Sequence, residues 1–367
     1  KKLFYLMQTN WCCKKLFINK IDKLKKIKVH FVGIGGIGMS GIAELMLDLG
    51  YKVQGSDIST NNNVRRLIKK GIKFYKGHKK TNIKKISVLV YSSAIKNNNP
   101  ELLECIKLSI PIISRAEMLA ELMKFKNSIA VAGSHGKTTT TSLVGSIFEK
   151  ANLDPTIVNG GIINSYSKNN RLGRGKWMIV EADESDGSFL RLPHQMNIIT
   201  NIDSEHLDYY HNKKNLLSVF KNFINNIPFY GYSVICTDNI NLRKIATEIK
   251  TKNIITYSMN QNSDVKILSI KKSKNNSEFS LLFKKNKIKN ISGKHNFITN
   301  LLGNHNILNV TSAIIISLLA KISIKKIKDS LNSFQGVERR FSYLGKINKA
   351  SVYDDYAHHP SEIKASY

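Results

Sequence analysis

Two glycine-rich turns, each between an apolar stretch and a predicted helix, constrain this chain most strongly. The first turn, GIGGIGMS at 33–40, follows the apolar stretch KVHFVGI at 28–34. The second turn, GSHGKT at 133–138, follows SIAVAGS at 128–134. A glycine turn between a parallel strand and a helix directs backbone N–H groups and a helix N-terminus at phosphate oxygens. The sequence therefore predicts two separate phosphate-binding sites.

Further apolar stretches indicate an α/β fold with parallel sheets, because strands and helices alternate along the chain. We expect a domain at 26–124, a central domain at 125–333, the beginning of a third domain at 334–367 and a basic N-terminal extension at 1–25. The last residues, HHPSEIKASY, stop within the first turns of an expected helix, so we expect the third domain to be incomplete. The predicted strands after the two turns are 51–57, 88–94, 111–115, 177–183, 196–202 and 232–238.

The net charge of +31 raises the question of a nucleic-acid partner. Lysine is spread along the whole chain, and no zinc-finger, RRM or basic-zipper pattern is present, so we predict no nucleic-acid partner. No apolar run reaches the roughly 18–20 residues of a membrane span, so we predict no membrane partner either. The four cysteines form neither a metal-site nor a disulfide pattern, which favours reduced thiols and a cytoplasmic location. The sequence does not indicate an oligomeric state.

The second turn carries the residues expected of an ATP site. Lys137 can reach the outer phosphates, and the Thr138 hydroxyl can bind Mg²⁺. The strict phosphate-loop pattern fails, because Val131 stands where its first glycine would be. The alternative is a lysine-capped turn without a ligand, which the preceding strand and the following helix disfavour.

Acidic residues and a histidine follow two later predicted strands. Glu181 and Asp183 lie in EADESD, at the end of 177–183. A carboxylate at this sheet edge is a candidate Mg²⁺ ligand, although an acidic loop in water has the same sequence. Beside a phosphate loop we favour Glu181 as the metal ligand. His206 follows 196–202, and a ligand role and a structural role are equally open for it.

Three later motifs add polar groups. Asn306 and Asn309 share one face at a helix start and could bind an adenine edge, although an N-capping role is the alternative for asparagines there. Arg339 and Arg340 offer planar donors for phosphate. The stretch YDDYAHHP at 353–360 is dense enough in carboxylates and histidines to indicate a site.

The first turn matches the dinucleotide fingerprint. Gly33, Gly35 and Gly38 have the required spacing, and Asp57 ends the next predicted strand. Taken alone, this pattern favours a nicotinamide-dependent enzyme. A glycine turn that holds a diphosphate does not need to hold a nicotinamide. A nicotinamide-dependent enzyme would also leave the Lys137 turn without a role.

Together these motifs resemble the Mur ligases of peptidoglycan synthesis. The resemblance covers about 28–367 and rests on ordered motifs that include HFVGIGGIGMSGIAELM, VAGSHGKTTTT, VEADESDGSFL, NIDSEHLDYY, GNHNILNV, GVERRF and DDYAHHPSEI. It implies a Rossmann-like UDP-sugar domain, a central P-loop ATPase-like domain and a third Rossmann-like ligase domain. Within the family, the glycine-rich first turn favours the member that joins L-alanine to UDP-N-acetylmuramate through an acyl phosphate, with ATP and Mg²⁺.

The resemblance also implies roles for individual residues. Lys137, His206, Arg340 and His358 are expected to be catalytic, and Thr138, Glu181 and His206 to bind metal. The expected ATP-binding residues are Gly133, Ser134, His135, Gly136, Lys137, Thr138, Thr139, Asn306, Asn309 and Asp355. The expected substrate-binding residues are Gly35, Gly36, Ile37, Gly38, Asp57, Ser92, Ser93, Arg115 and Tyr356.

Three alternatives remain open at this point. A sister ligase would add another amino acid or a peptide to the same kind of UDP-sugar. A nicotinamide-dependent oxidoreductase would use the first turn alone. An inactive fragment would be consistent with the abrupt end of the chain.

Overall fold

The structure is a computed structural model that describes residues 27–92, 94–163, 168–249, 253–273, 276–337, 342–348, 350–357 and 363. The chain divides into two compact units, Lys1–Leu119 and Ala120–Tyr367. The division falls inside helix α5 (Arg115–Met123), a few residues before the predicted domain boundary at 124. Within the predicted third domain, 334–367, residues 338–341, 349, 358–362 and 364–367 lie outside the described residues, and the domain boundary stays a prediction.

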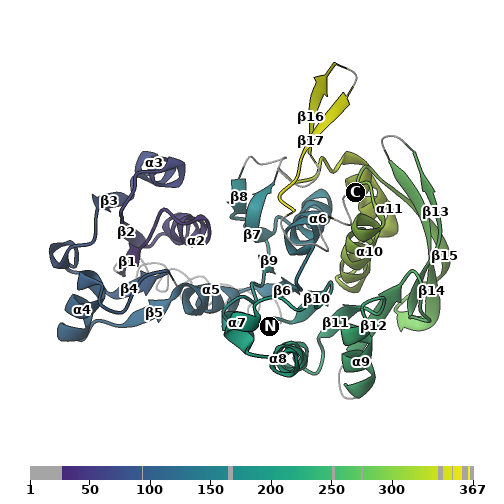
Figure 1. Ribbon diagram of the computed structural model, residues 1–367, viewed down its shortest axis with the longest axis horizontal. Helices are drawn as coiled ribbons and strands as arrows, with labels where there is room; N and C mark the ends of the chain where they lie inside the picture. The colour runs from purple at the N-terminus through teal and green to yellow at the C-terminus, as the bar shows by residue number, and fades with distance from the viewer. Residues whose placement is uncertain are drawn as a thin grey trace, which may run out of the picture. The chain divides into compact units, whose positions relative to one another are not determined.

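The first unit is a five-stranded parallel sheet with the order β3-β2-β1-β4-β5. Helices α2 and α3 cover one face and α4 covers the other (Figure 1). The apolar side chains of the central strands, such as Phe31, Val32, Leu89 and Val90, are fully buried because both faces are covered. The elements are β1 (Lys28–Val32), α2 (Ile37–Asp48), β2 (Lys52–Asp57), α3 (Asn62–Lys69), β3 (Lys73–Lys76), η1 (Lys80–Asn82), β4 (Val88–Tyr91), α4 (Pro100–Lys107) and β5 (Ile112–Ser114).

Local sequence signals explain where two of these helices begin. The Asn61 side chain accepts a hydrogen bond from the Val64 N–H and caps α3. The Asn99 side chain accepts from the Glu101 N–H, and Pro100 occupies the first turn of α4, where its missing N–H costs nothing. Helix α2 begins differently, because its N-cap residue is Gly36, which has no side chain to cap the helix.

The second unit contains a ten-stranded sheet with the order β15-β14-β13-β12-β11-β10-β6-β9-β7-β8. Its centre is parallel, and its two ends are antiparallel. The strands are β6 (Asn127–Ala132), β7 (Thr156–Ile163), β8 (Lys168–Arg171), β9 (Trp177–Glu181), β10 (Met196–Ile199), β11 (Tyr232–Cys236), β12 (Asn253–Ser258), β13 (Val265–Lys272), β14 (Ser277–Ile288) and β15 (Ile291–Thr299).

Helices α6 (Lys137–Lys150), α10 (Asn304–Leu319) and α11 (Ile324–Ser333) lie together on one face of this sheet, and α8 (Lys213–Asn225) and α9 (Ile240–Glu248) lie on the other (Figure 1). Short helices η2 (Ser188–Arg191) and α7 (Leu207–Tyr210) precede α8. A hairpin of β16 (Ser342–Ile347) and β17 (Ala350–Asp354) follows α11. No described helix is both long and apolar enough to cross a bilayer.

The parallel register determines where the site lies. Val131 of β6 pairs with Glu181 of β9, and Ala132 pairs with Ile199 of β10. The segments that follow these three strands therefore leave the sheet at one edge. The α/β fold with parallel sheets predicted from the sequence is confirmed.

Candidate functional site

The second glycine turn, 133–136, joins β6 to α6 in a conformation that requires glycine at two positions. Gly133 and Gly136 have φ values of +134° and +79°. A Cβ atom at Gly133 would lie 2.2 Å from Thr200 Oγ1, and one at Gly136 would lie 2.6 Å from Asn309 Oδ1. Both positions are therefore closed to side chains for conformational and for steric reasons.

The segment after β10 holds this turn in place. Asn201 Oδ1 accepts from the His135 N–H at 2.8 Å, and Asn201 Nδ2 donates to the His135 carbonyl at 3.0 Å. Thr200 Oγ1 donates to the same carbonyl at 2.6 Å. The Ser134 hydroxyl accepts from the Asp203 N–H at 2.9 Å. These contacts hold the turn in its conformation.

Lys137 begins α6 and folds back over the turn. Its ammonium donates to the carbonyls of Gly133 at 2.6 Å and Ser134 at 3.2 Å, and to Glu184 Oε1 at 2.9 Å. The positive charge thus lies directly at the turn and the helix N-terminus, where phosphate oxygens bind in such folds.

Thr138 and Glu181 meet at the neighbouring strand end. Thr138 Oγ1 donates to Glu181 Oε1 at 3.1 Å. Thr139, the next residue, is buried at the start of α6. A hydroxyl beside a carboxylate matches the oxygen ligands that Mg²⁺ prefers in nucleotide sites.

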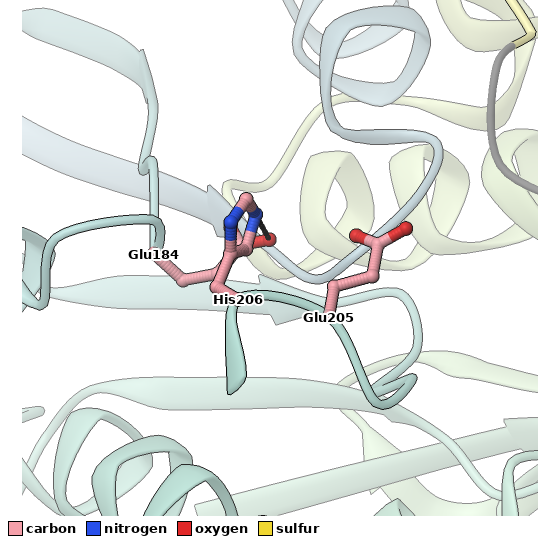
Figure 2. A group of neighbouring side chains, drawn as sticks. All are labelled: Glu184, Glu205 and His206. Carbon is pink, nitrogen blue, oxygen red and sulfur yellow. Dashed lines mark ion pairs between the residues drawn. The ribbon is translucent and has the colours of Figure 1, made fainter. Parts of the chain in front are cut away.

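Three side chains form a cluster that fits a metal ion. One ligand atom from each of Glu184, Glu205 and His206 lies within 4.8 Å of the others. Figure 2 shows the dashed ion pair between His206 and Glu184, 3.9 Å from Nε2 to Oε1, with Glu205 beside it. Glu184 Oε2 is buried without a hydrogen-bond partner among the described residues, as expected of an acceptor that a cation would satisfy.

Burial and charge oppose one another around Glu184. Its side chain is 1% exposed, and burial raises the pKa of its carboxyl although Lys137 opposes this shift. For Lys137, burial alone would lower the pKa, but the carboxylates of Glu184, Glu181 and Asp183 outweigh it and raise the pKa. The ammonium therefore stays charged at neutral pH.

His135 adds a further pair of acidic contacts inside the turn. Its Nε2 lies 2.8 Å from Asp203 Oδ2 and 3.5 Å from Glu205 Oε1. It therefore connects the turn to the acidic residues around His206.

The start of α10 lies against the turn through Asn309. This side chain is buried, and its oxygen faces Gly136. Asn309 Nδ2 lies 3.4 Å from Asn306 Oδ1, and Asn306 Nδ2 donates to the Leu302 carbonyl. Burial lowers the pKa of His305, and the charge of Asp355 opposes this shift, which puts Asp355 within electrostatic range of the same helix start. Tyr356 is exposed.

The first glycine turn, in the other unit, is held by Asp57. Its Oδ2 accepts from the Gly35 N–H at 2.8 Å, and its Oδ1 accepts from the Ser59 N–H. Asn61 and Asn63 both donate to the Gly35 carbonyl at 3.0 Å. Asp57 thus positions the turn, and its expected contact with substrate stays a prediction.

The other described residues expected to bind the substrate at this turn do not contact Gly35 in the same way. A Cβ atom at Gly38 would lie 2.6 Å from Arg115 Nη1, so Arg115 lies directly beside the start of α2. The Ser92 N–H donates to the Val32 carbonyl at the end of β1. Gly36 and Ile37 form the junction of the turn and α2. Ser93, Arg340 and His358 lie outside the described residues.

Neither Glu184 nor Glu205 was singled out from the sequence. Glu184 lies in the same acidic stretch as Glu181, EADESD, but no periodicity marks it as buried or as facing Lys137. The only available signal was the acidic stretch itself. Asn201 and Thr200 were also missed, since polar residues after a strand are common in loops.

Two family models match the chain over most of its length. The Mur ligase family, catalytic domain, matches residues 28–127, and the Mur ligase middle domain matches residues 131–317. The chain belongs to the Mur ligase family. The two glycine turns lie one in each matched region.

Similar proteins of this family include two curated UDP-N-acetylmuramate–L-alanine ligases. The protein of Agrobacterium fabrum is 48% identical over 337 residues, and that of Methylocella silvestris is 49% identical over 337 residues. Each alignment covers 92% of this chain and 72% of the relative.

Solved structures of Mur ligases have the same fold. The UDP-N-acetylmuramate-alanine ligase of Thermotoga maritima superposes with a TM-score of 0.79 at 27% identity, covering 92% of this chain and 76% of that one. A murein peptide ligase of Psychrobacter arcticus has a TM-score of 0.76 at 24% identity, covering 93% and 75%, and supports the fold alone.

Proposed function

We propose that this Mur ligase joins L-alanine to the lactyl carboxylate of UDP-N-acetylmuramate at the expense of ATP, a step in peptidoglycan precursor synthesis. The observation that carries the proposal is the Lys137 turn facing Glu181 and the cluster of Glu184, Glu205 and His206. Near 50% identity to curated alanine-adding ligases supports the choice of substrates. We expect the reaction in the cytoplasm, where ATP is available.

In this proposal the second turn binds ATP. The N–H groups at the start of α6 would face the β- and γ-phosphates, and Lys137 would exchange its contacts with the Gly133 and Ser134 carbonyls for phosphate oxygens. Asn309 lies against Gly136, and we expect Asn306 and Asn309 to contact the adenine, as the resemblance to the family implies. Asp355 would lie near the ribose.

Two groups of side chains would hold Mg²⁺. Thr138 and Glu181 supply a hydroxyl and a carboxylate at one position, and Glu184, Glu205 and His206 supply ligands at a second. When bound, Mg²⁺ would neutralise the phosphates and reduce the repulsion between the carboxylate and the γ-phosphoryl group. Glu184 Oε2, which is buried without a hydrogen-bond partner among the described residues, supports a Mg²⁺ ion at the second position.

The first turn would bind the diphosphate of the UDP-sugar. Asp57, Asn61 and Asn63 hold Gly35 by its N–H and its carbonyl, so the turn is preformed. Arg115 lies beside Gly38 and offers a cation for the same diphosphate. Ser92 and Ser93 are further candidates for this ligand.

The chemistry then proceeds in two displacements. The lactyl carboxylate attacks the γ-phosphorus, ADP leaves, and an acyl phosphate forms. The amine of L-alanine attacks the acyl carbon, and inorganic phosphate leaves as the amide forms. The protein contributes mainly positioning and charge neutralisation, with Lys137 facing the transferred phosphoryl group. Arg340, Tyr356 and His358 are expected to act near the nucleotide and the reacting groups.

Binding measurements test the proposal most directly. We would titrate the chain by calorimetry with UDP-N-acetylmuramate, with ATP and Mg²⁺, and with NADH. The proposal expects the first two to bind and NADH not to bind. Binding of NADH without the UDP-sugar would overturn it.

Turnover distinguishes the sister ligases. ADP release that requires both UDP-N-acetylmuramate and L-alanine is expected, and the murein tripeptide L-alanyl-γ-D-glutamyl-meso-diaminopimelate serves as the competing acceptor. Preference for the tripeptide would replace the alanine-adding assignment with that of a peptide ligase.

A further inference from the structure

A buried carboxylate in the first unit lies at the centre of a polar network. Glu101, in the first turn of α4, is fully buried, and its Oε2 accepts from the Ser56 hydroxyl at 2.5 Å. His78 Nδ1 lies 3.1 Å from the same oxygen and 2.9 Å from Ser56 Oγ. One carboxylate oxygen therefore joins α4, the end of β2 and the segment after β3.

The second oxygen of Glu101 has its own partners. Oε1 accepts from Asn82 Nδ2 at 2.6 Å, and His30 Nε2 lies 3.4 Å away. Gln54 Nε2 lies 3.1 Å from His30 Nδ1. An amide nitrogen only donates, so His30 Nδ1 must accept, and its ring proton lies on Nε2, facing Glu101. Despite the cost of burial, these contacts hold the pKa of the Glu101 carboxyl below its usual value.

Ser56 connects this network to the first glycine turn. Its carbonyl accepts from the N–H groups of Gly33 at 2.9 Å and Ile34 at 3.1 Å. The next residue, Asp57, accepts from the Gly35 N–H. Ser56 and Asp57, adjacent residues of β2, thus fix three consecutive N–H groups of the turn. Glu101 in turn holds Ser56 by accepting a hydrogen bond from its hydroxyl.

We propose that Glu101 is a positioning residue for the bound nucleotide diphosphate, acting through Ser56 on the backbone of 33–35. This inference rests on the proposed role of the first turn in binding the UDP-sugar. A turn fixed before binding loses less conformational entropy when the diphosphate arrives, so the Glu101–Ser56 contact contributes to affinity without touching the ligand.

Two variants interrupt the connection at different atoms. Glu101→Gln keeps the side-chain shape but replaces one acceptor oxygen with an N–H₂ group that faces the donors of Ser56 or Asn82. Ser56→Ala removes only the hydroxyl and keeps the carbonyl that holds Gly33 and Ile34. Because a buried acceptor is lost in one case and a donor in the other, we expect UDP to bind about tenfold more weakly to both.

The control is a buried carboxylate in the other unit. Asp264 accepts from the N–H and the hydroxyl of Thr256 and pairs with Lys287, away from both glycine turns in the sequence. Asp264→Asn is expected to perturb folding to a similar degree without changing UDP affinity.

The measurement is calorimetric titration of the wild type and the three variants with UDP, and separately with ATP and Mg²⁺. The inference expects weaker UDP binding with unchanged ATP binding for Glu101→Gln and Ser56→Ala, and neither change for Asp264→Asn. If Glu101→Gln does not fold, Ser56→Ala decides the question.

The outcomes separate the two ideas. A wild-type chain that does not bind UDP contradicts the proposed function itself. A wild type that binds UDP, with both first-unit variants binding equally well, overturns the positioning role alone. Equal weakening in all three variants would mean that lost stability explains the effect, and it would also overturn the inference.

Discussion

The ammonium of Lys137 lies 2.9 Å from Glu184 Oε1, so the cation of the phosphate turn is paired with a buried acid from the segment after β9. The same oxygen lies 3.9 Å from His206 Nε2. Glu184 therefore stands between the side chain expected to bind phosphate and those expected to bind metal. Its position connects the two halves of the proposed ATP site.

Replacing Lys137 removes the cation of the phosphate turn. Lys137→Ala is expected to reduce turnover by at least about 10²–10³-fold, since a charge-stabilising donor is lost, and to abolish measurable ATP binding. UDP-sugar affinity should not change, because the first turn belongs to the other unit. Calorimetry with both ligands and a phosphate-release assay measure these effects. Wild-type turnover in the variant would contradict the mechanism.

Removing the charge of Glu184 tests whether Glu184, Glu205 and His206 hold a metal ion. Glu184→Gln keeps an oxygen for Lys137 but weakens the site shared with Glu205 and His206. We expect the Mg²⁺ concentration for half-maximal turnover to rise by at least about tenfold. Mn²⁺ binding, followed by electron paramagnetic resonance, gives a readout independent of activity.

Two carboxamide variants serve as references for Glu184→Gln. Glu205→Gln should weaken Mn²⁺ binding in the same direction, because it removes another member of the cluster. Asp208→Asn, outside the cluster, should leave Mn²⁺ binding unchanged. Unaltered Mn²⁺ binding in the Glu184 and Glu205 variants would mean that these residues do not hold the metal ion.

The two left-handed glycines Gly136 and Gly293 provide a matched pair. Their φ values are +79° and +78°, but a Cβ atom would lie 2.6 Å from Asn309 at Gly136 and would have nothing within 4 Å at Gly293. Gly293→Ala should cost about 1 kcal/mol of folding free energy from the backbone alone. Gly136→Ala should cost about 2–4 kcal/mol and also weaken ATP binding, because Asn309 must move.

Urea unfolding and ATP titration of these two variants provide the comparison. Equal loss of stability in both would mean that the contact with Asn309 carries no energy. An unchanged ATP affinity in Gly136→Ala would mean that Asn309 does not contribute to ATP binding.

His194 makes stability depend on pH. It is buried against Phe223, its Nδ1–H donates to the Leu192 carbonyl, and its Nε2 accepts from Asn197 Nδ2. Burial lowers the pKa of His194 to about 4, from 6.5. The unfolded chain takes up this proton first, so the stability present above pH 6.5 falls as the pH drops towards 4, by about 3 kcal/mol in total.

His194→Gln should therefore flatten the acid limb of a plot of unfolding free energy against pH. The control is His211→Asn, because His211 is exposed and its replacement should leave the acid limb unchanged. An acid limb of unchanged slope in the His194 variant would assign the acid sensitivity to other groups.

The glycine turns and the strand ends could be predicted from the sequence because both depend on local patterns. Both turns follow apolar runs whose lengths are typical of buried parallel strands. The first turn contains Gly33, Gly35 and Gly38, and the second is 133–138. The positive φ of Gly33, Gly133 and Gly136 agrees with the reason for glycine at such turns. Motif order then indicated the family, which the matches to residues 28–127 and 131–317 confirm.

The partners of the buried charges depended on the tertiary structure. Within the acidic stretch, its place at a predicted strand end beside a phosphate loop indicated Glu181 as a metal ligand. That Glu184 is buried and faces Lys137 could not be predicted. Glu101 likewise looks in sequence like an ordinary first-turn glutamate, although it joins His30, Ser56, His78 and Asn82. These contacts join strands and loops far apart in the chain. Because local spacing cannot encode which remote side chain compensates a buried charge, only the folded arrangement decided them.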